Sequence, residues 1–548
     1  MTLQAQSVPP PNIIIILADD LGYGDVSYNR VNPDFLTPNI DSLTINGVKC
    51  TNGYVTHPFC SPSRAALLAG RYQPRFGHEE QPVDGTSLQG LPLTELTLAQ
   101  LLKPAGYVCG IIGKWHLGFA PSLSPTQRGF DYFYGFPGAA IPYWTQGVYA
   151  TDDFTQKAVS FINNNATHPF FLYLAYNAPH APYDTPPATY MAQVANITDS
   201  NRQIYAAMVT ALDAGVGQVL QALQNSNLLN NTLIFFLSDN GAPNSPYTQP
   251  SNYPLSGYKF SLFEGGIRVP FAIQWTGTLP ANAVYNQPVS SLDIVATAAA
   301  AAGVSLPPDR VYDGINLSPY LTGQQVSPQR TLFWRWFGLG LSGPWGSGNN
   351  IYAARSGDLK LSVLNAFAGS PRLFNLANDI GETTDLSKTQ PNDVASLQQS
   401  WNQWNAQMIE PLWTAGNGWS PNQLVLAGDW NGFNITNAAS PWTLTRISAP
   451  GARGSPDGFD WYTSTIHAAS DGTGDTTPGM HSFVLVANQS YSNQWGGVTI
   501  NIDDFTVLPF FPVLYSDRQT PFLWKMVSTI HFGFSLRCIQ AVPAGCLE

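Results

Sequence analysis

Residues 12–20 read NIIIILADD, and this stretch decides the predicted fold. It joins an unbroken apolar run to two aspartates, and such a run is typical of a strand buried on both faces of a parallel sheet. A second stretch of this kind, TLIFFLSDNG at residues 232–241, also ends in oxygen-bearing side chains. In open α/β sheets ligands bind at the edge where the carboxyl ends of the strands meet. The sequence therefore predicts an α/β domain with a site built from the ends of two strands.

Strand-like and helix-like segments alternate over the first 330 residues. Short apolar runs predict strands at residues 12–18, 107–112, 170–176, 232–237 and 271–274. Apolar residues at helical spacing predict helices at 97–103, 202–223 and 293–302. Strands that alternate with helices indicate an α/β domain with helices on both faces of a parallel sheet.

Two further regions follow this domain. Residues 331–410 predict a small α+β subdomain, with short strands at 332–336, 351–354 and 359–363 and a polar helix at 393–408. Beyond residue 411, segments such as QLVLAGDWNGFNITN are short, alternating and bounded by turns. We therefore expect an α/β domain over 1–330, a small subdomain over 331–410 and a β-rich appendage over 411–548, a candidate for binding substrate.

The composition narrows the classes of partner. Lys and Arg number 24 against 35 Asp and Glu, and the net charge of −11 argues against binding to nucleic acid or to an anionic membrane. The apolar run near the start, residues 13–18, is too short to cross a bilayer, and we expect no membrane span. Charged residues make up only 11%. We expect a secreted or periplasmic protein whose export signal is absent from this chain.

The five cysteines show no C-x-x-C pair that would suggest zinc. Cys50 and Cys109 lie in strand-like apolar runs and are interpreted as buried fillers. Cys538 and Cys546 fit either a local disulfide or two unpaired thiols. The fifth cysteine, Cys60, stands in a different context.

Four oxygen-bearing side chains follow the two apolar strands, namely Asp19, Asp20, Asp239 and Asn240. Three carboxylates brought together repel one another and resist ionisation unless a cation compensates them. Oxygen ligands favour calcium or magnesium over zinc. Either polar pair alone has an ordinary alternative as a helix N-cap or an Asx turn. Their joint position at the ends of two apolar strands predicts a metal site.

The segment CSPSR, residues 60–64, precedes a helix-forming apolar run. Pro62 suits a first helical turn, which places Cys60 at a helix N-terminus that favours anions. Arg64 lies four residues on and falls on the same helix face. A reactive residue beside a fixed cation suits a nucleophile, whereas the alternative is an ordinary cysteine N-cap.

CSPSR followed by AALLAGRY resembles the signature of the type I sulfatases, within the alkaline phosphatase superfamily. Further blocks resemble that family in its order, over roughly residues 11–410: ILADDLGYGDV (16–26), GIIGKWHLG (110–118), NAPHAPY (177–183), LSDNGA (237–242), GYKFSLFEGGIRVPF (257–271) and LFNLANDIGETTDL (373–386). The resemblance implies an alkaline phosphatase-like fold, in which helices sandwich a mixed, mostly parallel sheet and a small α+β subdomain follows.

The resemblance also implies that a maturation enzyme oxidises Cys60 to formylglycine, an aldehyde. One hydroxyl of the hydrated aldehyde attacks sulfur, and loss of the proton from the second hydroxyl expels sulfate, a step that a plain serine could not perform. The implied calcium ligands are Asp19, Asp20, Asp239, Asn240 and the modified Cys60.

Six residues receive implied catalytic roles, with Cys60 as the nucleophile. Arg64 stabilises the hydrated aldehyde, and Lys114 and His116 flank it, with His116 as the base that collapses the intermediate. His180 and Lys259 hold the sulfate, and one of them protonates the leaving oxygen. Lys114 and His116 alone could belong to a solvated loop, His180 to an ordinary turn and Lys259 to the surface, but their joint occurrence with Cys60 and the acidic strand ends favours the catalytic interpretation.

The sequence thus predicts a calcium-dependent sulfatase that hydrolyses the sulfate esters of a carbohydrate. One alternative is a phosphonate or phosphate ester hydrolase with the same nucleophile, and another is a non-catalytic glycan-binding protein. Trp334, Trp336 and Trp345 lie in a glycine-rich aromatic stretch and could stack on a sugar or aryl group, or pack in the core.

Overall fold

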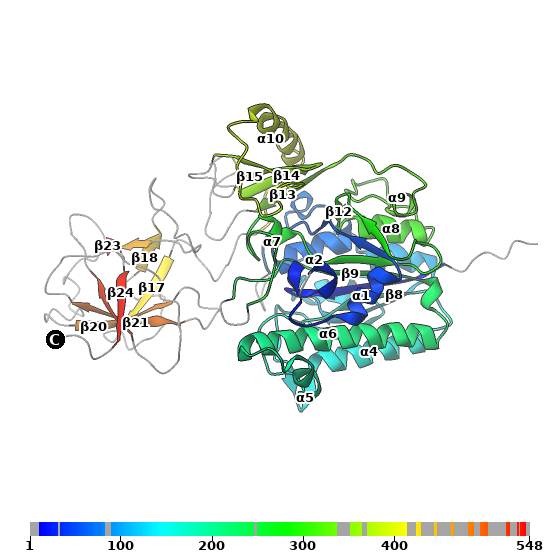
Figure 1. Cartoon of the computed structure of the whole chain (residues 1–548), viewed down its shortest axis with the longest axis horizontal. Coiled ribbons are helices and arrows are strands. Elements are labelled where there is room, and N and C mark those ends of the chain that lie inside the picture. Colours follow the sequence, from blue (N-terminus) through cyan, green and yellow to red (C-terminus); the bar gives the residue numbers. More distant parts are fainter. Residues whose placement is uncertain are drawn as a thin grey trace, which may run out of the picture. The chain divides into compact units, whose positions relative to one another are not determined.

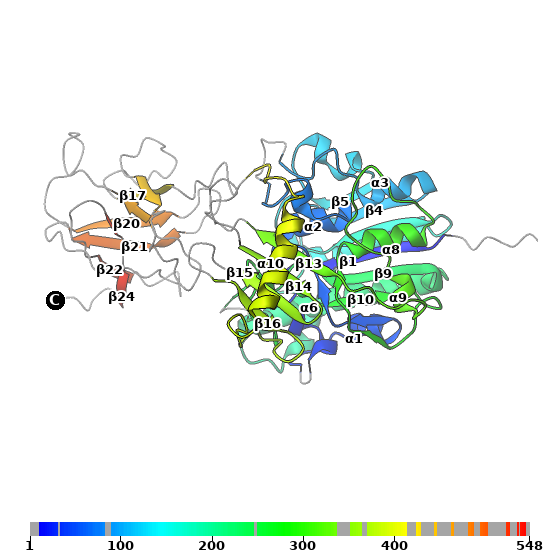
Figure 2. The same ribbon diagram turned by 90° about the horizontal axis from the view of Figure 1, so that it is seen from above.

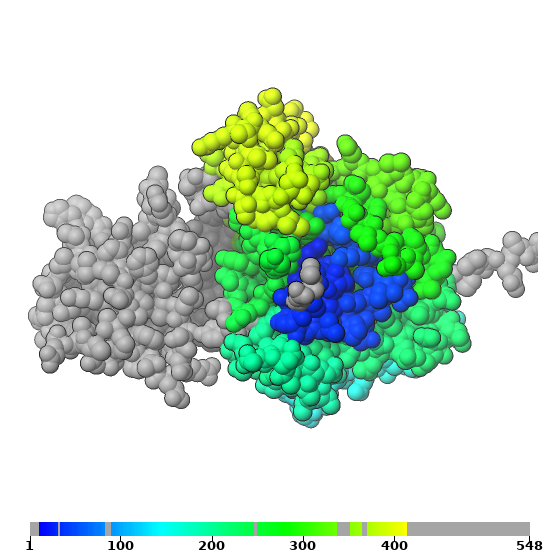
Figure 3. Space-filling view, in the orientation of Figure 1, coloured from blue at the N-terminus to red at the C-terminus, as the bar shows by residue number. Residues whose placement is uncertain are grey.

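The computed structural model describes residues 10–30, 33–82, 89–245, 249–336, 351–363 and 370–413, and eight strands beyond them. The chain divides into two compact units, Met1–Trp336 with Gly348–Trp413, and Phe337–Ser347 with Thr414–Glu548. On the surface of the first unit, residues from the beginning (blue), the middle (green) and the later part (yellow) of the chain lie side by side (Figure 3). Segments that are far apart in the sequence therefore lie next to one another in the first unit.

An eight-stranded sheet forms the centre of the first unit, in the order β11-β2-β10-β9-β1-β8-β4-β5. The strands are β1 (Asn12–Ala18), β2 (Val48–Cys50), β4 (Val108–Lys114), β5 (Tyr132–Phe136), β8 (Phe170–Ala175), β9 (Thr232–Ser238), β10 (Phe271–Gln274) and β11 (Ala283–Tyr285). The five from β9 to β5 run parallel. This confirms the predicted α/β fold with a mixed, mostly parallel sheet.

The direction of β10 corrects one prediction. The apolar run at 271–274 was expected to join the parallel strands, but β10 runs antiparallel to both of its neighbours, β9 and β2. Among the described residues between β9 and β10, the one helix is the one-turn α7 (Glu264–Ile267), which is too short for a crossover helix. The chain therefore re-enters the sheet at the end from which β9 left it, and the strand must run in the opposite direction.

Helices cover both faces of the sheet (Figures 1 and 2). On one face, α1 (Pro38–Ile45), α4 (Ala150–Asn164) and α6 (Ser200–Asn225) pack together; on the other lie α2 (Cys60–Ala69), α3 (Leu98–Leu102) and α8 (Asp293–Ala301). Alternate residues of β1 enter the two cores, since Ile13 and Ile15 face one and Ile14 and Ile16 the other. This explains why the strand reads as an unbroken apolar run.

The predicted helices lie close to the observed ones, but α1 and α4 were missed. Thr97, the N-cap of α3, forms a capping box with Gln100, and Asp199 caps α6 by accepting hydrogen bonds from two backbone N–H groups. Within the described ranges α6 is the one helix long and apolar enough to cross a membrane, and most of it is buried inside the protein. It is therefore accounted for as a core helix.

A four-stranded antiparallel sheet, β13 (Thr331–Trp336), β14 (Ile351–Ser356), β15 (Leu359–Val363) and β16 (Arg372–Asn375), carries α10 (Pro391–Asn405). These elements fall within the range predicted as a small α+β subdomain. Trp401 and Trp404 of α10 share a buried cluster with Ala66 of α2. The small subdomain is thereby packed against the helix that begins at Cys60.

Smaller elements complete the first unit: β3 (Gly53–Tyr54) pairs with β12 (Val289–Ser290), β6 (Trp144–Thr145) pairs with β7 (Val148–Tyr149), and α5 (Ala188–Met191) and α9 (Ser318–Leu321) are short.

In the second unit, a six-stranded sheet has the order β21-β20-β17-β18-β19-β23, and β22 pairs with β24. The strands are β17 (Gln423–Gly428), β18 (Thr443–Arg446), β19 (Tyr462–Ser464), β20 (Met480–Val486), β21 (Gln494–Asn501), β22 (Phe522–Met526), β23 (Phe534–Ser535) and β24 (Cys538–Pro543). The elements described in this unit are thus all strands. The side chains of Cys538 and Cys546, whose pairing was left open, lie outside the described residues, as does Trp345.

Candidate active site

The ends of β1 and β9 bring the predicted polar side chains together. The two strands are in register, with Ala18 opposite Ser238. The amide of Asp239 donates to the carbonyl of Ala18 at 3.0 Å, and the amide of Asp20 donates to Oδ1 of Asp239 at 3.2 Å. Asp20 has a left-handed φ of 65°, which turns the chain sharply after the strand. Asp19, Asp20, Asp239 and Asn240 are all buried at this edge of the sheet.

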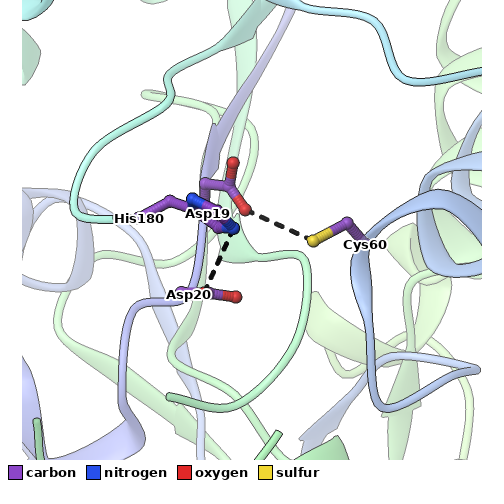
Figure 4. Close-up of side chains that lie close together, drawn as sticks. All are labelled: Asp19, Asp20, Cys60 and His180. Atoms are coloured by element: carbon purple, nitrogen blue, oxygen red, sulfur yellow. Dashed lines mark hydrogen bonds and ion pairs between the residues drawn. The ribbon is translucent and has the colours of Figure 1, made fainter. Parts of the chain in front are cut away.

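Cys60, the first residue of α2, points toward Asp19, which lies next to Asp20 and His180 (Figure 4). Its Sγ lies 3.6 Å from Oδ1 of Asp19 and 3.4 Å from Nζ of Lys259. The potential ligand atoms of Asp19, Asp20, Cys60 and His180 all lie within 4.8 Å of one another. Four segments of the chain, β1, α2, the loop after β8 and the loop after β9, therefore meet at one point.

Three cations neutralise the three carboxylates. Each aspartate has its own partner at 2.7 Å: Nζ of Lys114 reaches Asp19 Oδ2, Nζ of Lys259 reaches Asp20 Oδ1, and Nη2 of Arg64 reaches Asp239 Oδ2. The cations come from the end of β4, from the segment 257–263 and from α2. As these groups stand, the site is close to electrical neutrality.

The donor set fits a hard divalent cation. Nδ2 of Asn240 donates to Asp20 Oδ1 at 2.6 Å and to the carbonyl of Gly241 at 3.0 Å. Oδ1 of Asn240 is buried and has no hydrogen-bond partner among the described residues, which is costly unless a cation binds it. Carboxylate and amide oxygens are the ligands that calcium and magnesium prefer. A divalent ion here would give the site two positive charges in excess, which suits an anionic substrate.

The ionisation states agree with this interpretation. Burial tends to raise the pKa of Asp19 and Asp20, but Lys114 and Lys259 respectively, together with His180, hold both values below the usual one. Both aspartates are therefore ionised at neutral pH. Burial raises the pKa of the Cys60 thiol to about 12, against the opposing effect of Lys114 and Lys259. The unmodified thiol is therefore protonated in this environment, and a thiol is a weaker nucleophile than a thiolate.

His180 points toward the acidic cluster. Its Nδ1–H donates to the carbonyl of Ala181 at 2.5 Å, which turns Nε2 toward Oδ2 of Asp20 at 3.6 Å. Burial lowers the pKa of His180, although Asp19 and Asp20 oppose the shift. The neutral ring thus offers the lone pair of Nε2 to the cluster, so His180 has the geometry of a metal ligand as well as that of a sulfate contact.

His116 has a strained backbone, with a φ of 57°. Its side chain is buried, and Nδ1 lacks a hydrogen-bond partner in the described part of the chain. Burial, then Lys114 and Arg64, lower the pKa of His116 well below its usual value. The imidazole is therefore neutral, and one of its ring nitrogens carries a lone pair.

Two supporting residues were not foreseen as part of the site. The hydroxyl of Ser61 donates to the carbonyl of His116 at 2.6 Å and lies 2.7 Å from Nε2 of His78. These contacts brace the strained peptide of His116. Ser61 belongs to the CSPSR segment, and this was the one available signal, whereas nothing near His78 in the sequence points to the site.

The tryptophans considered for sugar stacking pack in the interior. Trp334 and Trp336 are 2% and 5% exposed, and the indole N–H of Trp334 donates to the carbonyl of Val55 at 2.7 Å. Packing, the alternative weighed against stacking, accounts for both.

Comparisons with known proteins identify the family. The sequence profile described as Sulfatase matches residues 11–304. Human N-acetylgalactosamine-6-sulfatase is 36% identical over 370 residues, which are 60% of this chain and 68% of that protein. Bovine arylsulfatase A is 32% identical over 492 residues, 77% of this chain and 91% of that protein. The crystal structure of Ps i-CgsB in complex with k-i-k-neocarrahexaose is 35% identical, with a TM-score of 0.69, and covers 74% of this chain and 95% of that one.

A site of this geometry, the matched profile and enzymes of known activity at this level of identity agree with one another. Members of the family in general use a metal and a formylglycine residue, and the chain offers a cysteine and a buried group of metal-ligating side chains at one place. The chain therefore belongs to the sulfatase family and is a sulfuric ester hydrolase.

Proposed function

We propose that this sulfatase removes sulfate from a sulfated carbohydrate, with Cys60 in its formylglycine form and with calcium as the metal. The observation that carries the proposal is the buried meeting of Cys60 with Asp19, Asp20 and Lys259 at one edge of the sheet. The substrate class is supported by the names of the relatives, which include an N-acetylgalactosamine-6-sulfatase and an enzyme crystallised with a carrageenan oligosaccharide.

Asp19, Asp20, Asp239 and Asn240 would hold the calcium ion, and Nε2 of His180 is available as a further contact. When bound, the metal would polarise the sulfate oxygens and make a hydroxyl of the hydrated aldehyde at residue 60 more acidic. Aspartates that are already ionised bind a cation without releasing protons, so the site is prepared for a metal.

The cations of the chain act on the sulfate group. Nζ of Lys259 lies 3.4 Å from Cys60 Sγ and can therefore contact a group attached or transferred there. Lys114 forms an ion pair with Asp19 in the same site. Fixed positive groups placed where charge develops lower the barrier without reorganisation.

Arg64 serves the site through Asp239. Nε of Arg64 donates to Oδ2 of Asp239 at 2.8 Å, and Nη2 pairs with the same oxygen. The guanidinium therefore fixes the carboxylate of Asp239 and adds positive charge close to Asp19 and Asp239. The sequence resemblance implied a more direct role for Arg64, the stabilisation of the hydrated aldehyde.

His116 and His180 divide the proton transfers. His116 is neutral and buried, so it can take a proton from the group at residue 60. His180 is partly exposed at its side chain and turns Nε2 toward Asp20, so after Nε2 takes up a proton from solvent it can deliver that proton to the leaving oxygen.

The rival phosphoryl substrate differs in charge. A phosphate monoester carries about two negative charges near neutral pH, whereas a sulfate ester carries about one. The excess charge of the metal-loaded site would attract both, so the ratio of the two activities on matched esters distinguishes them. The non-catalytic alternative is disfavoured because all the ionisable side chains assigned by resemblance are present, and all of them except the partly exposed His180 are buried.

We also propose that the protein acts outside the cytoplasm and depends on a formylglycine-generating enzyme of its host. The low share of charged residues, 11%, supports the first part. Mass spectrometry of the peptide that contains Cys60 tests the second, because the aldehyde differs in mass from the thiol.

A desulfation screen tests the activity. N-acetylgalactosamine 6-sulfate, a carrageenan oligosaccharide and 4-nitrophenyl sulfate are each offered with calcium, with magnesium and with a chelator. Cys60→Ala should abolish release of sulfate, while Cys109→Ala, at a buried cysteine in the core, should retain it. Activity that survives in Cys60→Ala would show that residue 60 is not the nucleophile.

A further inference from the structure

A cluster of aromatic rings lies beside Cys60. Phe59 directly precedes the nucleophile, and its ring centroid lies 5.3 Å from that of Phe260 and 5.6 Å from that of Trp336. The rings of Phe260 and Trp336 are 6.2 Å apart, and His57 meets Phe59 edge-on at 4.3 Å. These four side chains, His57, Phe59, Phe260 and Trp336, form a continuous aromatic wall on one side of the site.

Of the four, Phe260 alone reaches solvent. Phe59 and Trp336 are 1% and 5% exposed and His57 is fully buried, whereas Phe260 is 39% exposed. One side of the Phe260 ring is therefore supported by the wall, and another part of its surface stays open. Burial of this surface by a ligand would be favourable.

The backbone holds Phe260 in a costly conformation. Its φ is 69°, in the left-handed region that glycine or asparagine adopts with less strain. Its amide donates to the carbonyl of Pro58 at 2.9 Å, and the amide of Lys259 donates to the carbonyl of Ala242 at 3.0 Å. The ring is thereby fixed to the segment that leads into Cys60. An aromatic side chain at such a position is a reason to look for a function.

Phe260 is also close to the sulfate-binding cation. Nζ of Lys259 lies 5.5 Å from the centroid of the Phe260 ring and 3.4 Å from Sγ of Cys60. If a sulfate group is held between Lys259 and residue 60, the sugar that carries this sulfate would therefore lie within reach of the Phe260 ring. The sugar ring presents C–H groups on its faces, and these pack well on an aromatic surface.

We infer that the exposed ring of Phe260 is the platform on which the sulfated sugar ring stacks, and that Phe260 is a specificity-determining residue of this sulfatase. The inference rests on the proposed function, since it assumes a carbohydrate at the site. It adds that recognition of the sugar is apolar and comes from the residue that follows Lys259. Ligand sites commonly combine aromatic surface with a few placed polar groups, and Lys259 and Phe260 supply one of each.

Steady-state kinetics with N-acetylgalactosamine 6-sulfate and the carrageenan oligosaccharide test the platform. Phe260→Ala should raise KM roughly 2- to 12-fold, the range expected for an aromatic contact, with little change in kcat. Phe260→Tyr should restore the wild-type KM, because it keeps the ring. Phe260→Leu keeps apolar bulk without a flat face and should resemble Phe260→Ala. The matched control is Tyr253→Ala on the same segment, since Tyr253 is 72% exposed, and its KM should be unchanged.

Inhibition by inorganic sulfate separates stacking from support of the loop. Sulfate has no ring to stack, so its inhibition constant should stay within about twofold of wild type in Phe260→Ala. A proportional rise in that constant would mean that Phe260 merely positions Lys259, and this would overturn the inference. An unchanged KM for both sugars in Phe260→Ala would overturn it as well.

Calorimetric titration of the same two sugars into Cys60→Ala protein, with and without Phe260→Ala, keeps the test independent of turnover. Binding that weakens 2- to 12-fold without the ring upholds the platform even if no ester is hydrolysed, an outcome that would reject the proposed activity alone. If the wild-type enzyme desulfates the sugars but Phe260→Ala does not change their affinity, the platform is rejected and the proposed activity stands. Failure of both sugars to bind the Cys60→Ala protein rejects the platform too.

Discussion

Lys360→Met should sharply destabilise the protein, because Lys360 joins the small subdomain to the loop of the active site. Nζ of Lys360 on β15 lies 2.9 Å from Oε1 of Glu264, the first residue of α7, and 2.9 Å from Oε1 of Glu382. Lys360 and Glu264 are fully buried. Removal of the ammonium would leave two carboxylates buried without their shared cation.

The size of the loss follows from that burial. Removing one partner of a buried ion pair costs about 3–5 kcal/mol, whereas an exposed pair is worth less than about 1 kcal/mol. Arg268 still contacts Oε2 of Glu264 at 3.2 Å, so Glu264 keeps a partner and Glu382 suffers most. We therefore expect the free energy of unfolding to fall by about 3 kcal/mol in Lys360→Met.

The loss should grow with pH. Burial raises the pKa of Glu382 from 4.5 to about 7, although Lys360 opposes the shift. A carboxyl whose pKa is higher in the folded state than in the unfolded state lowers stability as pH rises between the two values. Without Lys360 the folded-state pKa of Glu382 rises further, so the decline extends above pH 7. The destabilisation should be larger at pH 8 than at pH 5.

Urea denaturation of the full chain at both pH values measures the effect, with the transition of the first unit followed by tryptophan fluorescence. Lys388→Met, at an exposed lysine of the same subdomain, is the control and should change stability by less than about 0.5 kcal/mol. Adding Glu382→Gln to Lys360→Met should restore part of the loss. A cost below about 1 kcal/mol at pH 8, or a larger cost at pH 5, would refute the reasoning.

Three further outcomes are expected. Asn240→Ala should weaken calcium binding roughly tenfold or more in a direct titration, because its free Oδ1 is lost as a ligand; unchanged affinity would remove Asn240 from the metal site. Ser61→Ala should lower kcat roughly 2- to 10-fold with KM nearly constant, because the carbonyl of His116 loses the hydrogen bond from the Ser61 hydroxyl. A fall in thermal stability with kcat unchanged would argue against this role. Thr97→Ala should cost about 1 kcal/mol of stability in denaturant titration through loss of the capping box of α3, with normal kinetics.

The ends of the buried strands were predictable because their signal is local. An apolar run followed at once by Asp19 and Asp20, and a second followed by Asp239 and Asn240, need only the rule that parallel strands share an edge for their carboxyl ends. The structure places these four side chains together. The family resemblance then drew attention to Lys114 at the end of β4 and to Lys259 in the segment 257–263, neither of which is marked by a distinctive local pattern.

The features that sequence reasoning missed depend on pairings between distant residues. The direction of β10 is set by the path of the chain between it and β9, not by the apolar content of residues 271–274. Lys360 is separated from Glu264 by 96 positions, and no local pattern marks either as buried. In the sequence nothing distinguishes Phe260 from the other aromatic residues. Its proposed role depends on the exposure of its ring beside Lys259.

These distant contacts also explain how one loop can carry both chemistry and recognition. Lys259 and Phe260 lie five residues or fewer before Glu264. Among the described elements, no strand pairing involves the segment from Lys259 to Glu264. Two of its anchors are the hydrogen bond from the amide of Phe260 to the carbonyl of Pro58 and the ion pair between Glu264 and Lys360. The small subdomain therefore stabilises the active site from outside it. If this is right, Lys360→Met should raise KM for the sulfated sugar at temperatures where the protein is still folded, and an unchanged KM there would confine Lys360 to global stability.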